Sequence, residues 1–218
     1  MKFRDRTDAG QRLAERLLHL RGANPVVLAL PRGGVPVGAP IADALDAPLD
    51  LLMARKIGAP GHAELAIGAV VESERPEIVV NDDIAEMVGA SQAFIAEEAA
   101  RQIKEIERRR ALWLRGRPSI SWAGRTVIVV DDGIATGATI RAGLLSLDRA
   151  GAARRVLAVP VAPPEAAEML RPLCDETIFL AKPKYFNSVG AFYDDFHQVE
   201  DAEVIALLDN AAARRSSG

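Results

Sequence analysis

The chain has 218 residues, of which 49% are hydrophobic and 26% charged, with a formal net charge of −3. This length suffices for one α/β domain with a buried core, and the acidic balance argues against a protein that coats nucleic acid. One cysteine, Cys174, excludes an intramolecular disulfide framework, and no apolar run approaches the length of a membrane span. We expect a single domain over residues 1–218, in the cytoplasm, with no nucleic-acid or membrane partner.

The N-terminal region is predicted to form a helix that covers a sheet. Thr7 or Asp8 is expected to cap this helix, which extends to about Leu20 with leucines along one side. A short apolar run over residues 26–30 then predicts a first strand.

A glycine-rich turn, Arg32, Gly33 and Gly34, follows the first strand and precedes a helix that ends near residue 45. Two glycines at the end of a strand expose backbone N–H groups, and an arginine side chain matches phosphate oxygens. The turn therefore either binds an anion or is a plain Gly-Gly turn.

A second strand is predicted over residues 49–54, and it ends at two adjacent cations, Arg55 and Lys56. Glycines and a proline in residues 57–64 predict a mobile loop. The cations form either a binding lip or a solvated basic turn. The loop has two titratable side chains, His62 and Glu64. Either is a candidate for proton transfer on a substrate, and the alternative is that both are ordinary surface residues.

The middle of the chain is predicted to hold two strands, over residues 66–72 and 77–81, joined by a polar turn at residues 73–76. Asp83 and Glu86 have the spacing of a capping box for a short helix. A longer helix, from residue 91 to about 114, mixes arginine and glutamate along its surface. This mixture predicts a solvated face with ion pairs rather than a nucleic-acid patch.

The most informative stretch begins with four β-branched residues, 127–130, which are typical of a strand buried on both faces. Two carboxylates follow at once, Asp131 and Asp132, which suit sugar hydroxyls or a hydrated Mg²⁺. The next loop is made of small residues, and its backbone N–H groups and hydroxyls suit a phosphate. The loop residues concerned are Gly133, Ala135, Thr136, Gly137, Ala138 and Thr139.

The C-terminal third continues the alternation with a helix over 138–150, strands over 155–161 and 176–180, and a final helix over 201–213. This order predicts an α/β fold: a doubly wound, mainly parallel sheet with helices on both faces. An aromatic segment, residues 182–200, contains Phe192 and Tyr193 and either stacks a planar ring or forms a hydrophobic plug.

The run Val127-Ile-Val-Val-Asp-Asp-Gly-Ile-Ala-Thr-Gly-Ala-Thr139 closely resembles the ribose-phosphate signature of type I phosphoribosyltransferases, and the resemblance extends over roughly residues 25–195. That family binds 5-phosphoribosyl-1-pyrophosphate (PRPP) and uses Mg²⁺. The resemblance implies that Asp131 and Asp132 hold the ribose hydroxyls and the metal, with the 5′-phosphate on the loop that follows.

The same resemblance assigns roles to the two earlier turns. It implies that Arg32, Gly33 and Gly34 form a pyrophosphate loop with a cis peptide at Arg32–Gly33. Arg55 and Lys56 would then act in catalysis near pyrophosphate, on a loop that closes over the reaction. Residues 182–200 would form a small hood over the acceptor.

The implied activity is transfer of the phosphoribosyl group to a nitrogen acceptor such as a nucleobase, with release of pyrophosphate, in nucleotide metabolism or salvage. A regulator of the same fold that senses PRPP without catalysis is the first alternative. A synthase-type subunit is disfavoured because no adenine-nucleotide phosphate loop is present. The sequence does not name the acceptor, and a homodimer through the first or the basic helix is an open expectation.

Overall fold

A five-stranded parallel sheet forms the centre of the protein, in a computed structural model that describes residues 1–72 and 76–216, apart from the side chains of Glu64 and Ser216. Its order is β2-β1-β6-β7-β8, and every neighbouring pair is parallel. The strands are β1 (Pro25–Ala29), β2 (Leu49–Leu51), β6 (Thr126–Val130), β7 (Arg154–Val161) and β8 (Glu176–Ala181).

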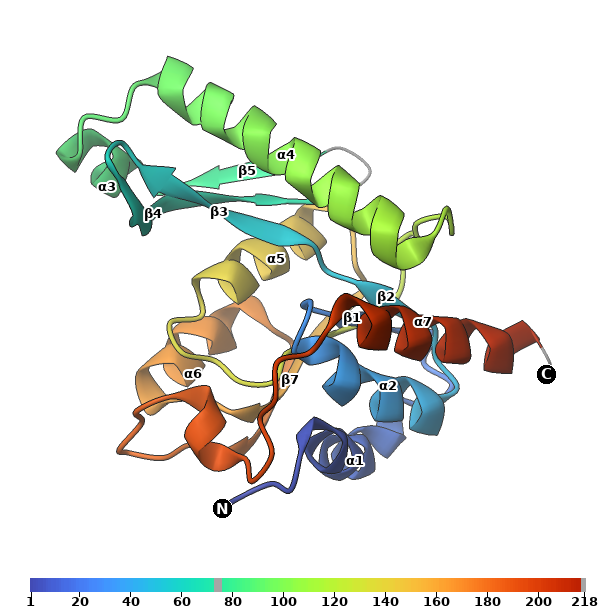
Figure 1. Ribbon diagram of the computed structural model, residues 1–218. Coiled ribbons are helices and arrows are strands. Elements are labelled where there is room, and N and C mark those ends of the chain that lie inside the picture. The colour runs from blue at the N-terminus through green and yellow to red at the C-terminus, as the bar shows by residue number, and fades with distance from the viewer. Residues whose placement is uncertain (73–75, 217–218) are drawn as a thin grey trace.

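Helices cover both faces of this sheet (Figure 1). One face carries α1 (Arg6–Leu17), α2 (Gly34–Leu45) and α7 (Asp201–Ser216), and the other carries α5 (Ala138–Arg149) and α6 (Pro164–Leu170). Alternate strand residues divide between two cores: Val27 and Ala29 pack toward α1 and α2, whereas Val26 and Leu28 pack toward α5 and α6. The predicted doubly wound parallel fold is confirmed, because strands buried on both faces need a hydrophobic layer on each side.

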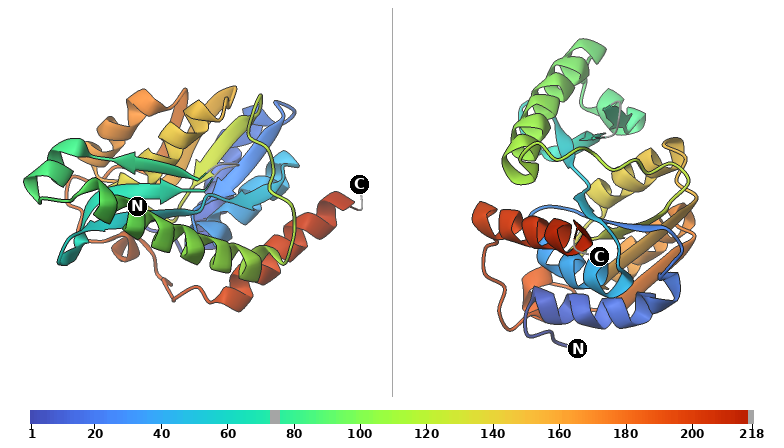
Figure 2. Two further views of the ribbon diagram at one scale, coloured as in Figure 1. Left: turned by 90° about the horizontal axis from the view of Figure 1, so that it is seen from above. Right: turned by 90° about the vertical axis from the view of Figure 1, so that its right-hand side faces the viewer.

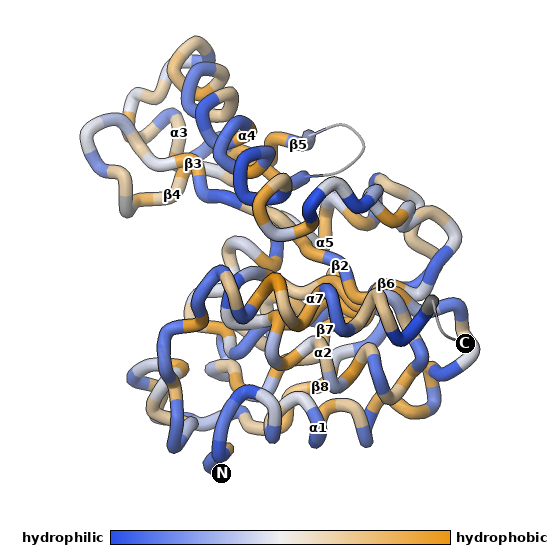
Figure 3. Tube along the Cα trace, turned by 45° about the vertical axis from the view of Figure 1, so that its right-hand side comes forward, coloured by the Kyte–Doolittle hydropathy of each residue, from blue (hydrophilic) through white to orange (hydrophobic). Residues whose placement is uncertain are grey.

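A second sheet stands beside the first, between β2 and β6 in the chain (Figure 2). It is antiparallel, with β3 (Ala54–Ala59), β4 (His62–Val71) and β5 (Glu77–Val80), followed by α3 (Asp82–Met87) and α4 (Gln92–Leu114). Helix α4 packs on one face of this sheet and α5 on the other. In Figure 3 the tube of α4 alternates between hydrophilic and hydrophobic stretches, as expected for a helix with one buried side.

Two expectations for residues 49–64 are wrong. The strand predicted over 49–54 is two strands, because β2 belongs to the parallel sheet and β3 to the antiparallel one. The loop predicted over 57–64 is a β-hairpin in which Ala59 pairs with His62. Gly61 adopts a φ of +73°, which allows the tight turn, and Ile57 is fully buried against the core.

Helix starts also differ in detail from the expectations. Asp5, rather than Thr7 or Asp8, caps α1 and accepts a hydrogen bond from the Asp8 backbone N–H. Asn81, rather than Asp83, caps α3. In each helix the extended backbone that a cap requires lies a few residues earlier than the pattern indicated. The turn predicted at residues 73–76 lies outside the described residues except for Pro76.

The arginine-rich side of α4 is paired with glutamates, as predicted. Arg101 contacts Glu98 at 2.8 Å, and Arg108 and Arg109 contact Glu105 at 2.8 and 2.6 Å. Over the described ranges, none of the helices combines the length and hydropathy needed to cross a membrane.

Short 3₁₀ turns complete the chain: η1 (Leu18–Leu20), η2 (Arg171–Leu173) and η3 (Val189–Phe192). The last of these lies in the segment between β8 and α7, which returns across the carboxyl ends of the parallel strands toward α1.

Candidate active site

The two glycine-containing loops meet where the order of the parallel strands reverses. β2 lies on one side of β1, while β6, the next parallel strand in the chain, lies on the other. In open parallel sheets, such a reversal leaves a crevice at the carboxyl ends of the strands, and ligands bind there. The loops after β1 and β6 are joined at their start, since the Leu30 N–H donates to the Val130 carbonyl at 2.9 Å. The sequence therefore brings residues 32–34 and 131–132 to one place.

Glycine is required where these loops touch. A Cβ atom on Gly33 would lie 2.1 Å from Asp132 Oδ2, and one on Gly34 would lie 2.7 Å from the Val130 carbonyl oxygen. The Gly-Gly turn is thus fitted to the acidic pair rather than being a plain turn. The cis peptide expected at Arg32–Gly33 is instead the Pro31–Arg32 bond, one residue earlier.

The acidic pair is largely removed from water. Burial raises the pKa of Asp131 well above its usual value, and the neighbouring Asp132 carboxylate adds to the increase. Burial also raises the pKa of Asp132, although the hydrogen bond from Arg6 opposes this. The Asp132 backbone N–H donates to Asp131 Oδ1 at 2.8 Å, which fixes the first carboxylate above the strand end. A ligand that donates hydroxyl groups or carries positive charge would relieve this concentration of negative charge.

Arg6 is the site residue that the sequence did not reveal. Its Nε donates to Asp132 Oδ2 at 2.8 Å, and its Nη1 donates to the His197 carbonyl at 2.8 Å. Its guanidinium lies 3.9 Å from the centroid of the Phe196 ring, and the residue is only 7% exposed. The signal in the sequence was weak, since Arg6 stands among several charged residues at the N-terminus.

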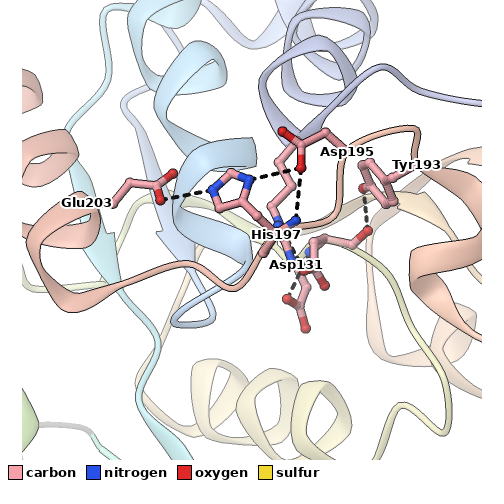
Figure 4. A network of polar contacts seen from close by, with 7 residues as sticks. Asp131, Tyr193, Asp195, His197 and Glu203 are labelled. Carbon is pink, nitrogen blue, oxygen red and sulfur yellow. Dashed lines mark hydrogen bonds and ion pairs between the residues drawn. The ribbon is translucent and has the colours of Figure 1, made fainter.

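The segment over residues 182–200 supports the acidic loop from one side (Figure 4). The Tyr193 hydroxyl donates to the Asp132 carbonyl at 2.6 Å, and the ring packs against Phe3 and Phe196. His197 lies between Asp195 and Glu203, at 3.2 Å from each carboxylate. This part of the segment packs against the acidic loop and supports it. It therefore resembles the hydrophobic plug that was one of the two alternatives expected from the sequence.

The predicted acceptor pair separates in the structure. Tyr193 is 4% exposed, so its ring has no free face for a planar ligand. Phe192 stacks on Phe186 with ring centroids 5.6 Å apart. Acceptor stacking on Phe192 stays a prediction.

The loop after the acidic pair has the form expected for a phosphate site. Gly137 caps α5 with a φ of +76°, a conformation that favours glycine. The Ile134 N–H donates to the Val161 carbonyl at 2.9 Å, which anchors the loop to β7. In the described part of the chain, the N–H groups of residues 135–137 donate to no other group. They stand at the start of a helix, where an anion is favoured.

The predicted cations divide between two places. Arg32 lies near the start of α7, 3.6 Å from Asp201 and 3.9 Å from Glu200. Arg55 and Lys56 lie on β3 and line a cavity that includes Thr139 but none of residues 31–34. The role predicted for Arg55 and Lys56 near pyrophosphate stays a prediction. His62 lines the same cavity, whereas the side chain of Glu64 lies outside the described residues.

Taken together, the crevice between β1 and β6, its acidic pair and its amide-rich loop define an α/β protein whose site has the chemistry that suits a phosphorylated ligand with hydroxyl groups. The family of the phosphoribosyl transferase domain matches residues 4–187 of the chain. The chain therefore belongs to the phosphoribosyl transferase domain family, and the resemblance drawn from residues 127–139 is confirmed.

Known relatives agree with this classification. Two Mycobacterium tuberculosis proteins, from strains CDC 1551 / Oshkosh and H37Rv and each named "Putative phosphoribosyl transferase", are 44% identical over 209 residues. These matches cover 96% of this chain and 47% of each relative, so the chain spans about half the length of the curated relatives it matches. The crystal structure of TT1426 from Thermus thermophilus is similar with a TM-score of 0.83 and 45% identity, over 95% of this chain and 98% of that one.

Proposed function

We propose that the chain transfers the 5-phosphoribosyl group of PRPP to a nitrogen acceptor, such as a nucleobase or a related heterocycle, and releases pyrophosphate. The observation that carries this proposal is the close contact between the Gly33 turn and Asp132, which supports a site with the acidic pair between two turns whose N–H groups suit anions. A ribose phosphorylated at both ends has hydroxyl groups in the middle and charge at each end. The site has the complementary arrangement, with carboxylates in the middle and a turn that suits an anion on each side.

The donor would be bound in three parts. Asp131 and Asp132 accept hydrogen bonds from the two ribose hydroxyls. The N–H groups of residues 135–139, with the Thr136 hydroxyl, receive the 5′-phosphate at the start of α5. Arg32 and the Gly33 N–H receive the pyrophosphate. The Gly34 N–H donates to the Leu30 carbonyl at 2.9 Å, so it holds the turn itself. Arg55 and Lys56 line a neighbouring cavity with Thr139, and their role near pyrophosphate stays a prediction.

The reaction breaks the bond between ribose C1 and a pyrophosphate oxygen and forms a bond between C1 and the acceptor nitrogen. The pyrophosphate leaves with the bonding electrons, and the acceptor nitrogen loses its proton to solvent or to the leaving group. Positive charge develops on the ribose ring, and the carboxylates of Asp131 and Asp132, which hold the ribose hydroxyls in this proposal, would stabilise it. The main contribution of the protein is to hold the two reactants in line.

Mg²⁺ fits the donor set at this site. The acidic pair offers two carboxylates, and among the described residues no cluster of three or more His, Cys, Asp or Glu side chains could hold a metal. Mg²⁺ is commonly held by one or two carboxylates together with substrate phosphates and water, so this set suffices. Bound there, the metal would neutralise charge on the leaving group. Asp131 is the better placed ligand, since Asp132 already accepts from Arg6.

The proposal is tested by calorimetric titration with PRPP and Mg²⁺, followed by a screen of nitrogen heterocycles for pyrophosphate release. Asp132→Asn should lower turnover by about 10²-fold, the usual loss when one group that stabilises developing charge is removed. The matched control is Asp175→Asn, at the exposed start of β8, which should leave turnover unchanged.

The outcomes separate the two candidate functions. PRPP binding that Asp132→Asn weakens, together with pyrophosphate release on at least one acceptor, supports the transferase. PRPP binding without release on any acceptor supports the sensing regulator instead. Near-normal turnover in Asp132→Asn overturns the role given to the acidic pair.

A further inference from the structure

A pocket lined by three arginines lies at the end of the parallel sheet opposite the candidate active site. Its volume is about 470 Å³. Pro25, the first residue of β1, and Arg125, which directly precedes β6, both line it. The Gly-Gly turn and the acidic pair follow the other ends of these strands, and strands of five residues span about 17 Å. The pocket is therefore separate from the site proposed for PRPP.

Three distant parts of the chain supply the arginines. Arg21 follows η1, Arg125 precedes β6, and Arg215 lies in the last turn of α7. Figure 1 shows α7 beside α2, and at the end of α2 the Arg215 Nη1 donates to the Asp46 carbonyl at 2.9 Å. The three side chains converge through the fold, so they do not form a charged run of the sequence.

The positive charge of this pocket is not balanced by the residues that the structure describes. Asp46 is the carboxylate among the described lining residues, and it faces three guanidinium groups. Within the described ranges, none of Arg21, Arg125 and Arg215 forms an ion pair with a carboxylate. The chain as a whole has a net charge of −3, so the excess of cations is local. Cations gathered in a concave surface attract anionic ligands.

Arg125 is the least exposed of the three arginines and is held in place before any ligand binds. Its Nη2 donates to the Pro25 carbonyl at 3.1 Å, which joins the start of β6 to the start of β1. Its Nε is buried and has no hydrogen-bond acceptor among the described residues. A buried donor without an acceptor destabilises the folded state, and an anion bound beside the guanidinium would offset this cost.

Phosphate fits this arrangement better than a carboxylate does. A phosphate monoester carries about 1.5 to 2 negative charges at pH 7 and has three free oxygens. Guanidinium groups from three segments can each donate to one of these oxygens. A carboxylate has one charge and two oxygens in one plane, so the fork of a single arginine already satisfies it.

We propose that this pocket is a second ligand site, which binds the phosphate group of a small phosphorylated molecule. The phosphate would lie among the three arginines, and the organic part would contact the apolar remainder of the lining, Pro25, Leu45 and Pro48. The inference goes beyond the transferase function and does not depend on it, because the pocket shares no residue with the acidic pair or with the two glycine-containing loops.

The test compares phenyl phosphate with benzoate, two probes that present different anions on the same ring. Dissociation constants are measured by calorimetry at pH 7.5. The wild-type protein should bind phenyl phosphate at least about tenfold more tightly than benzoate, a difference of about 1.4 kcal/mol. Higher salt should weaken the binding of phenyl phosphate more than that of benzoate, because the phosphate carries more charge.

Two neighbouring arginines on α7 provide a matched comparison. Arg215 lines the pocket, whereas Arg214 pairs with Asp43 at 3.0 Å and lies outside it. Arg215→Gln should weaken the binding of phenyl phosphate at least about tenfold, equivalent to one charge-assisted hydrogen bond, and Arg214→Gln should leave it unchanged. Arg21→Gln repeats the test on another segment. Both pocket positions are exposed, so the variants should fold, and circular dichroism checks this.

Thermal unfolding gives a second measurement of the same site. A ligand that binds only the folded protein raises its melting temperature. Phenyl phosphate should therefore raise the melting temperature of the wild type and of Arg214→Gln by the same amount, and should raise that of Arg215→Gln by less.

The contrary outcomes are distinct. Equal affinities for phenyl phosphate and benzoate, or no binding of phenyl phosphate, overturn the proposal. Unchanged binding in both Arg21→Gln and Arg215→Gln places the phosphate elsewhere and also overturns it. If a single-stranded oligonucleotide binds in a manner that depends on Arg215 while phenyl phosphate does not, the pocket is a nucleic-acid surface instead. Failure of the wild type to bind PRPP would refute the transferase function and leave the comparison of Arg215→Gln with Arg214→Gln intact.

Discussion

Arg6 Nε and Asp132 Oδ2 lie 2.8 Å apart, and this ion pair joins the N-terminal helix to the acidic loop of the candidate site. The side chains are 8% and 15% exposed, so the pair is shielded from water. The second donor of Arg6 reaches the His197 carbonyl, which adds the segment before α7 to the same unit. One side chain thus ties together three parts of the chain that are distant in sequence.

Arg6→Gln should lower the free energy of unfolding by about 3 kcal/mol at neutral pH, since it leaves the Asp132 carboxylate buried without its partner. Loss of Arg6 also removes an interaction that holds the pKa of Asp132 down, so this pKa should rise further. Affinity for PRPP should then fall away at a higher pH than in the wild type as the solution is acidified. Denaturant unfolding and calorimetry at several pH values measure the two effects.

The control for this variant is Arg12→Gln on the same helix. Arg12 pairs with Asp8 at 2.8 Å but is 39% exposed and does not contact the acidic loop. Arg12→Gln should cost only about 1 kcal/mol, because Arg12 is partly exposed and Asp8 keeps the hydrogen bond from the Arg4 backbone N–H, and it should leave PRPP affinity unchanged. Equal losses in the two variants would show that Arg6 acts only through its helix.

Asp131→Asn should stabilise the free protein at neutral pH while it weakens PRPP binding. The pKa of Asp131 is raised by burial and by Asp132, so above its usual pKa the folded state holds a proton that the unfolded state has released. The free energy of unfolding of the wild type therefore falls as the pH rises from the usual pKa of an aspartate toward the raised pKa of Asp131. The variant has no carboxylate at this position, so its free energy of unfolding does not fall in this way. Its advantage should grow as the pH rises above the usual pKa of an aspartate, with a rise in melting temperature of about 2–4 °C for each kcal/mol.

Asp175→Asn provides a comparison of opposite sign. A hydrogen bond from the Arg155 backbone N–H lowers the pKa of Asp175, so its contribution to stability is present above its usual pKa and is lost as pH falls. This variant should be slightly less stable than the wild type at pH 7, and the difference should disappear on acidification. A profile for Asp131→Asn that parallels the Asp175→Asn profile would contradict the assigned burial of Asp131.

The sequence predicted the parallel sheet and the acidic loop because both depend on local signals. Four β-branched residues followed by Asp131 and Asp132 can be read directly, and the meeting of this loop with Gly33 follows from the geometry of parallel strands. Arg6 could not be predicted, because its partner lies 126 positions away and a charged N-terminal residue usually faces solvent.

The hairpin over residues 54–71 was missed for a different reason. Glycine and proline around Pro60 are typical of loops, and the alternation in β3 is interrupted by the adjacent cations Arg55 and Lys56. The hairpin is stabilised by packing of Ile57 and Val70 toward α4, which begins only at Gln92 and so is distant in the sequence. Tertiary packing therefore overrides the local preference.

Gly33→Ala should reduce PRPP affinity more than it reduces stability. The new Cβ would lie 2.1 Å from Asp132 Oδ2, so the carboxylate must rotate away from Arg6 and from the ribose position. We expect a loss of affinity of about tenfold or more, equivalent to one charge-assisted hydrogen bond. Gly22→Ala is the control, because Gly22 has a φ of +82° and a Cβ added there would have no neighbouring atom within 4 Å. This variant should cost about 1 kcal/mol of stability through its backbone conformation and should not change PRPP affinity. Similar PRPP affinities in both variants would contradict the close fit of the two loops.

Tyr193→Phe separates a supporting role for this side chain from direct stacking on the acceptor. Its hydroxyl donates to the Asp132 carbonyl at 2.6 Å, and burial raises its pKa, so it stays protonated and remains a donor. Removal of the hydroxyl should cost about 1–2 kcal/mol of stability and lower turnover by loosening the acidic loop. The KM for the acceptor should not change, because the ring is buried against Phe3 and Phe196. A raised acceptor KM with unchanged stability would instead place Tyr193 in the acceptor site, and steady-state kinetics beside denaturant unfolding distinguish the two.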